Sequence, residues 1–105
     1  MQPVWHDACT LDELVDREPL PVWVADTPIA VVRVAERTYA LHDVCTHEDA
    51  PLSEGVVVDG CLECPMHQGR FDLATGAAMR RPCTVAVRSY PTRVLGATVQ
   101  VGLLS

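Results

Sequence analysis

Two short segments of the chain each hold a cysteine and a histidine, side chains that bind metals. The first segment is Cys45-Thr46-His47, and the second is Cys64-Pro65-Met66-His67. Together they offer two thiolates and two imidazoles. Four ligands of these types suit either an iron–sulfur cluster or a tetrahedral zinc ion. The way in which the ligand types are paired along the chain separates the two kinds of site.

Each segment supplies one cysteine and one histidine, whereas the common zinc arrangement places two cysteines in one arm and two histidines in the other. A [2Fe–2S] centre of the Rieske type instead has both cysteines on one iron and both histidines on the other. We therefore expect Cys45 and Cys64 to bind one iron of such a cluster, and His47 and His67 to bind the second iron. Zinc remains the alternative, which a brown, redox-active protein would dismiss.

Histidine ligands change the redox chemistry of such a cluster. Neutral imidazoles donate less charge than thiolates, so the iron that they bind is the easier one to reduce. Replacing two of four cysteines by histidines raises the reduction potential from about −400 mV to a range of about −150 to +300 mV. The ligand types therefore point to one-electron transfer.

The residues around the ligands resemble the two cluster-binding loops of Rieske proteins. The matching stretches are 45–55 (CTHEDAPLSEG) and 64–76 (CPMHQGRFDLATG). The likeness is strongest to the small Rieske ferredoxins of bacterial aromatic-ring dioxygenases, and it is close over residues 41–83. It implies a single Rieske domain, in which a cluster-binding subdomain at about 41–83 is inserted into a basal β-barrel made from about 1–40 and 84–105.

The resemblance also implies a function. It indicates a one-electron carrier rather than an enzyme, with Cys45 and Cys64 on a buried iron and His47 and His67 on an iron near the surface. The expected partners are a flavoprotein ferredoxin reductase as donor and a terminal oxygenase of aromatic compounds as acceptor. Residues 82–85 are similar to those of carbazole dioxygenase ferredoxins. The alternative is a Rieske-like small subunit of another oxidoreductase such as nitrite reductase, in which the ligands are often missing.

Departures from other Rieske proteins indicate a low potential. Respiratory and photosynthetic members have an extra cysteine in each loop, and the pair forms a disulfide; this chain has Asp49 and Met66 there. High-potential members also have a serine and a tyrosine that donate hydrogen bonds to the cluster sulfurs, where this chain has Gly69 and Phe71. Fewer donors stabilise the reduced cluster less, so its potential is expected near the low end of the range.

Composition narrows the kinds of partner. The chain has 105 residues, eight arginines, no lysine, fourteen acidic residues and a net charge of −6, which argues against binding nucleic acid. No apolar run approaches the length of about 18 residues that spans a membrane, and no basic-then-apolar leader opens the chain.

We expect a cytoplasmic monomer that docks transiently. A rim of Asp43, Glu48, Asp49 and Glu54 beside the first loop, opposed by arginines 70, 80 and 81, would suit such docking.

The hydrophobic pattern indicates an all-β, antiparallel sandwich or small barrel. There are sixteen valines and few aromatic residues, and frequent turn signals separate short runs of β-branched residues. Thr10 and Glu13 form a capping box for one short helical turn. Asp59-Gly60 predicts a type I′ hairpin that brings the two ligand segments together. The expected strands lie at 4–6, 21–25, 29–35, 38–42, 56–58, 61–63, 71–73, 85–90, 94–95 and 98–101.

The remaining cysteines and histidines have plainer interpretations. We expect Cys9, Cys61 and Cys83 to be small apolar fillers, although Cys61 and Cys64 together form a CxxC pair that is also found in redox sites. His6 and His42 are expected to be ordinary strand residues. A catalytic non-haem iron would need two further histidines and a carboxylate. The two that remain, His6 and His42, both precede the ligand segments, and we see no catalytic domain that would hold a substrate, so we expect no oxygenase activity.

Overall fold

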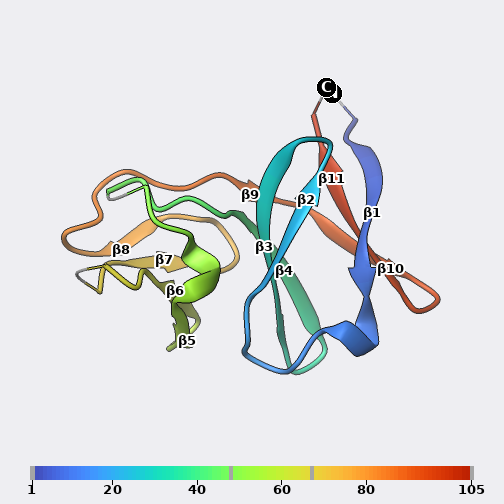
Figure 1. Cartoon of the computed structure of the whole chain (residues 1–105), viewed down its shortest axis with the longest axis horizontal. Helices are drawn as coiled ribbons and strands as arrows, with labels where there is room; N and C mark the ends of the chain where they lie inside the picture. The colour runs from blue at the N-terminus through green and yellow to red at the C-terminus, as the bar shows by residue number, and fades with distance from the viewer. Residues whose placement is uncertain (1, 48, 67, 105) are drawn as a thin grey trace.

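The chain folds into antiparallel β-structure, as predicted. The computed structural model describes residues 2–47, 49–66 and 68–104, and these form three sheets. The first has the order β1-β11-β10, from β1 (Val4–Thr10), β11 (Thr98–Leu103) and β10 (Thr92–Leu95). Pairing of β1 with β11 places the two ends of the described chain side by side (Figure 1).

The second sheet has the order β2-β3-β4-β9. Its strands are β2 (Leu20–Val24), β3 (Thr27–Val34), β4 (Arg37–His42) and β9 (Ser89–Tyr90). Pro21 predicts an edge position for β2, because proline has no N–H to donate within a sheet, and the runs 29–35 and 38–42 predict a hairpin. Both predictions are confirmed, since β2 lies at the edge of the sheet and β3 pairs with β4 as a hairpin. Between β1 and β2, the short helix η1 (Leu11–Glu13) begins at the predicted capping box, where the Thr10 N–H donates to the Glu13 carboxylate at 2.9 Å.

The third sheet lies to one side of the other two (Figure 1) and has the order β5-β6-β7-β8. Its strands are β5 (Val56–Val58), β6 (Cys61–Glu63), β7 (Arg70–Asp72) and β8 (Ala78–Arg80). Asp59 and Gly60 both have positive φ, 51° and 74°, which is the type I′ geometry predicted for the β5–β6 turn. The short helix η2 (Leu52–Glu54) precedes β5.

Two apolar clusters form the core of the described residues. One cluster joins the first two sheets, and its buried residues are Cys9, Leu14, Val24, Ile29, Val31, Ala40, Val99 and Val101. The other, here called the loop core, joins β3 and β4 to the third sheet and its flanking loops. Its buried residues are Ala30, Val32, Leu41, Cys45, Leu52, Leu62, Cys64, Phe71, Leu73, Cys83 and Val87. The loop core thus holds both predicted cysteine ligands.

The strand predicted over residues 85–90 is wrong except at its end, because β9 comprises only Ser89 and Tyr90. Residues 81–88 form a loop, and several of its backbone groups bond to residues of other loops. The Val87 N–H donates to the Gly76 carbonyl at 2.9 Å, and the Val85 carbonyl accepts a bond from the Thr46 hydroxyl at 2.6 Å. Within the part of the chain that the structure describes, no helix has the length and apolar character needed to cross a membrane.

Two turn glycines with positive φ offer a paired test of this packing. Gly76 (φ 78°) lies against the Val87 carbonyl, which a Cβ would overlap, whereas Gly96 (φ 62°) has open space around it. We expect Gly96→Ala to lower the free energy of unfolding by about 1 kcal/mol, the cost of the left-handed backbone alone. Gly76→Ala should cost at least about 1 kcal/mol more. Thermal unfolding followed by circular dichroism checks this, and equal losses would contradict the close packing of loop 81–88.

Candidate iron–sulfur site

The two predicted ligand loops are closed by the same kind of backbone hydrogen bond. In the first, the Cys45 N–H donates to the carbonyl of Ala50 at 2.8 Å, and in the second the Cys64 N–H donates to the carbonyl of Gly69 at 2.7 Å. The fourth residue after each cysteine, Asp49 or Gln68, has positive φ, 54° and 63° respectively. Each cysteine therefore begins a closed loop of the same size, fixed by its own backbone.

Both cysteines end up in the loop core, at 0% and 1% relative exposure for Cys45 and Cys64. The Met66 N–H donates to the Cys64 sulfur at 3.4 Å. A buried thiolate is costly unless a cation or hydrogen-bond donors compensate its charge. Two buried sulfurs in one cluster of residues, with a backbone donor aimed at one of them, fit the cysteine-bound iron of a [2Fe–2S] centre.

The histidines complete the predicted set only in part. His47 lies exposed on the first loop, whereas His67 is outside the described residues. Among residues 2–47, 49–66 and 68–104, no three Cys, His, Asp or Glu side chains are gathered closely enough to hold a metal. The structure thus brings together Cys45 and Cys64 and places His47 on the surface of the same region, and the four-ligand set stays a prediction.

Asp43 holds the first ligand loop, a role that the sequence analysis missed. Its carboxylate is buried and accepts two bonds from Ser53, one from the N–H and one from the hydroxyl, both at 2.6 Å. Its own N–H donates to the Pro28 carbonyl at 2.9 Å. Asp43 therefore connects β3, the loop of Cys45 and helix η2. The sequence signal that could have indicated this role is the position of Asp43, two residues before the predicted ligand Cys45.

The predicted two-signed rim needs correction. Asp43 is 7% exposed and binds Ser53, so it does not belong to a solvent-facing rim, and Glu48 lies outside the described residues. In the strands that follow the second loop, Arg70 of β7 bonds to Glu63 at 3.0 Å, and Arg80 of β8 approaches the same carboxylate at 3.7 Å. Part of the expected surface charge is therefore used to join strands β6, β7 and β8.

Loop 81–88 covers the two cysteines from a third side. Cys83 is buried there, with its Sγ 3.9 Å from the Sγ of Cys45. Burial, followed by the negative charge of the Cys45 sulfur and its hydrogen bond, and then the charge of Cys64, raises the pKa of the Cys83 thiol to about 12. Its buried position and these charges favour the protonated thiol over the thiolate.

The other cysteines suit a structural role. Burial, with a smaller effect of Glu13, raises the pKa of Cys9 to about 11, and burial, with Asp72 next in effect, raises the pKa of Cys61. A raised pKa disfavours the thiolate that metals bind. These observations agree with the filler role, which stays a prediction. His42 also has a structural contact, since its Nδ1 lies 3.4 Å from the hydroxyl of Tyr90.

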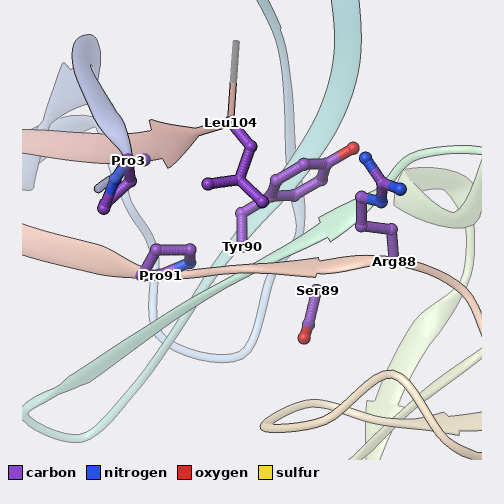
Figure 2. A pocket seen from close by; sticks show the side chains of 7 residues that line it. Pro3, Arg88, Ser89, Tyr90, Pro91 and Leu104 are labelled. Carbon is purple, nitrogen blue, oxygen red and sulfur yellow. The ribbon is translucent and has the colours of Figure 1, made fainter. Parts of the chain in front are cut away.

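A hollow of about 390 Å³ lies away from the ligand loops, at the junction of β9 with the chain ends (Figure 2). Its described lining residues are Pro3, Arg88, Ser89, Tyr90, Pro91, Gly102 and Leu104. They include no carboxylate, cysteine or histidine. The lining residues that the structure describes therefore include none of the side chains that usually bind a catalytic metal.

Comparison with known proteins assigns the family. The model of the Rieske [2Fe–2S] domain matches residues 4–91. The ferredoxin subunit of anthranilate 1,2-dioxygenase from Burkholderia cepacia is 44% identical over 99 residues, which cover 94% of this chain and 92% of that protein. The ferredoxin of carbazole 1,9a-dioxygenase from Nocardioides aromaticivorans IC177 superposes with a TM-score of 0.91 at 36% identity, covering 99% of this chain and 100% of that one.

A further solved structure is a complex of reduced oxygenase and oxidized ferredoxin in carbazole 1,9a-dioxygenase. One of its chains matches with a TM-score of 0.87 and 35% identity, over 94% of this chain and 93% of that one. The chain belongs to the Rieske [2Fe–2S] domain family, and its cofactor is a Rieske-type [2Fe–2S] cluster rather than zinc. Within that family it is a ferredoxin, a protein that transfers electrons and turns over no substrate.

The anchor at Asp43 can be tested by substitution. Asp43→Ala removes both bonds from Ser53 and leaves the backbone N–H of Ser53 without its acceptor. We therefore expect the free energy of unfolding to fall by about 1–3 kcal/mol. Ser53→Ala is the matched control, since it removes only the hydroxyl bond and should cost less. Thermal unfolding and the rate at which the visible absorbance bleaches measure the two effects. Equal, small losses would show that Asp43 does not hold the loop.

Proposed function

We propose that this ferredoxin carries single electrons from a flavoprotein reductase to the terminal oxygenase of an aromatic-ring dioxygenase system. The observation that carries the proposal is the pair of buried cysteines, Cys45 and Cys64, held by two loops with the same closing bond. The names of the relatives support it, because they are ferredoxin components of dioxygenase systems and one similar structure is a complex of oxygenase with ferredoxin.

We assign Cys45 and Cys64 to the buried iron, and His47 and His67 to the outer iron. The cluster, when bound, supplies a one-electron couple. The chain's own residues exclude water from the two sulfurs and fix them in place. Full burial leaves the sulfurs out of contact with solvent, and the Met66 N–H helps to balance the charge on Cys64. A rigid, dry site of this kind changes little when an electron arrives or leaves.

Electrons should enter and leave on the side of His47, which is exposed on the first loop. Met66 on the second loop and Val85 on loop 81–88 are also exposed, at 44% and 63%. The Thr46–Val85 bond joins the first loop to loop 81–88. An apolar surface around a histidine ligand suits brief docking, because it desolvates easily and needs no fixed ion pairs.

Several finer assignments accompany this proposal. The cluster is of low potential, since position 69 has no side chain and Phe71, which has no hydroxyl, is fully buried. The protein acts as a cytoplasmic monomer. The ligand-bearing part is a subdomain at about 41–83 inserted between residues 1–40 and 84–105. Its own sheet, β5–β8, supports this division.

The alternative, a small subunit of a nitrite reductase, is the weaker one. A putative nitrite reductase small subunit from Mycobacterium tuberculosis does share the fold, with a TM-score of 0.89, 98% of this chain and 97% of that one covered. Its sequence identity is 26%, against 44% for the anthranilate dioxygenase ferredoxin subunit. The complete set of two cysteines and two histidines in this sequence also favours the electron carrier.

Reconstitution tests the proposal directly. The reductase and oxygenase components of an anthranilate 1,2-dioxygenase system would be mixed without their own ferredoxin. Adding this chain should restore substrate oxidation and NADH consumption in step with its concentration. If the purified, cluster-bearing chain is reduced chemically yet supports no turnover with any of several dioxygenase component pairs, the assigned partners are wrong.

The histidine assignment predicts a shift in potential. His67→Cys should keep a cluster but lower its reduction potential toward the value of about −400 mV typical of four-cysteine clusters, because a thiolate donates more charge. His6→Cys in strand β1 is the control and should leave the potential unchanged. Voltammetry of the two proteins measures both effects. An unchanged potential in His67→Cys would show that His67 is not a ligand.

A further inference from the structure

Cys83 contacts both ligand loops at once. Its side chain is 3% exposed, and its Sγ lies 3.9 Å from the Sγ of Cys45 in the first loop. In the second loop it lies against Gly69, the residue whose carbonyl closes the turn of Cys64. A Cβ at position 69 would overlap the Cys83 sulfur and stand 3.0 Å from its Cβ. Gly69 therefore leaves room for this one thiol.

The position of the thiol is fixed by the backbone of its own loop. The Cys83 N–H donates to the Arg80 carbonyl at 3.2 Å, just beyond strand β8. Two residues later, the Val85 carbonyl accepts the bond from Thr46, the neighbour of Cys45. Loop 81–88 is thus tied to the first ligand loop on the far side of Cys83, and the sulfur of Cys83 is held toward that of Cys45.

A thiol at position 83 can donate a hydrogen bond in addition to filling space. An alanine or valine would also fill an apolar space, but the S–H group is a weak hydrogen-bond donor. Hydrogen bonds to the sulfurs of an iron–sulfur cluster stabilise its reduced, more negative form and so raise the reduction potential. The sulfur nearest to Cys83, among the contacts that the structure gives, is that of Cys45.

We propose that Cys83 donates an S–H···S hydrogen bond to Cys45 and thereby raises the reduction potential of the cluster. Cys83 would act on the cluster only through Cys45, so its role is that of a positioning residue for the Cys45 sulfur. The role rests on the proposed assignment of Cys45 as a ligand. In this arrangement the donor reaches the Cys45 sulfur from loop 81–88, and the missing side chain at Gly69 leaves space for the Cys83 thiol.

The test compares holo-protein variants at position 83 by voltammetry and by pulsed EPR of the reduced cluster in H₂O and D₂O. Cys83→Ala removes the donor, so the equilibrium constant for reduction should fall by up to about tenfold, which is about 59 mV for one electron. Cys83→Ser keeps a donor and should hold the potential at or above that of the wild type. One exchangeable proton coupling should disappear in Cys83→Ala and persist in Cys83→Ser.

Cys61→Ala is the matched control, since Cys61 is a second buried cysteine near the second loop and is expected to leave the potential unchanged. If Cys83 only fills space, the potentials of the variants would differ from those expected above. If Cys83→Ala leaves the potential unchanged or raises it through added water, or if alanine and serine behave alike, the proposal is overturned. Should Cys83→Ala fail to bind a cluster, the serine variant decides: a lowered potential there refutes the donor role, and a maintained one with its proton coupling supports it.

A separate variant distinguishes this proposal from the ligand assignment. Cys45→Ser should alter the EPR spectrum or abolish the cluster, because it changes an atom bound to iron. If Cys45→Ser retains the wild-type spectrum, Cys45 is not a ligand and the assignment fails whatever position 83 does. If Cys45→Ser changes the spectrum while Cys83→Ala changes nothing, the ligand assignment stands and only the role of Cys83 falls.

Discussion

The fold depends on one constraint: two cysteine sulfurs from separate segments must be buried beside each other. The interval 48–63 separates these segments, and the β5–β6 hairpin turns it back on itself. Each cysteine then opens a loop closed by its own N–H, bonded to a carbonyl five residues later. Burying two thiolates in an apolar core is unfavourable without a cation, and a metal centre held by the two sulfurs would supply that cation.

The surrounding elements hold the two cysteine-bearing loops in place. Asp43 fixes the first loop to helix η2 and to strand β3, and the bonds of Glu63 with Arg70 and Arg80 join the strands that flank the second loop. Loop 81–88 closes the third side. None of these elements resembles a catalytic site, and each limits movement of the sulfurs. A carrier of single electrons gains from such restraint, because a site that moves little has little to reorganise at each transfer.

Sequence reasoning succeeded where local chemistry dictates structure. The Asp59-Gly60 turn was predictable because its two positive φ values suit Asp-Gly, and the edge position of β2 followed from the missing N–H of Pro21. It was incomplete where distant contacts decide. The β3–β4 hairpin was predicted without a turn type, because its turn has no glycine; Ala35 there has φ 55°, and its N–H donates to Asp16 at 2.7 Å. Likewise, the strand expected at 85–90 is mostly a loop, because its backbone bonds to Gly76 and Thr46.

The family was predictable from the sequence, whereas the contacts that support the two loops were not. The pairing of cysteine with histidine identified the family, but the carboxylate of Asp43 was taken for a surface charge, and the contact of Cys83 with the Cys45 sulfur was not predicted. Asp43 lies only two residues before Cys45, but no sequence pattern marks its bonds to Ser53, and Cys83 comes close to Cys45 only in three dimensions. Gly69 is similar: its value is the room that it leaves for Cys83, since nothing in its own backbone requires positive φ.

The reduction potential of the purified protein tests the central claim most directly. Film voltammetry at neutral pH should give a single one-electron couple near about −150 mV, the low end of the Rieske range, as expected for a cluster that has few hydrogen-bond donors and feeds an oxygenase. A couple near about +300 mV would contradict the low-potential assignment and point to a different electron donor and acceptor. The absence of any couple would contradict the account of the site itself.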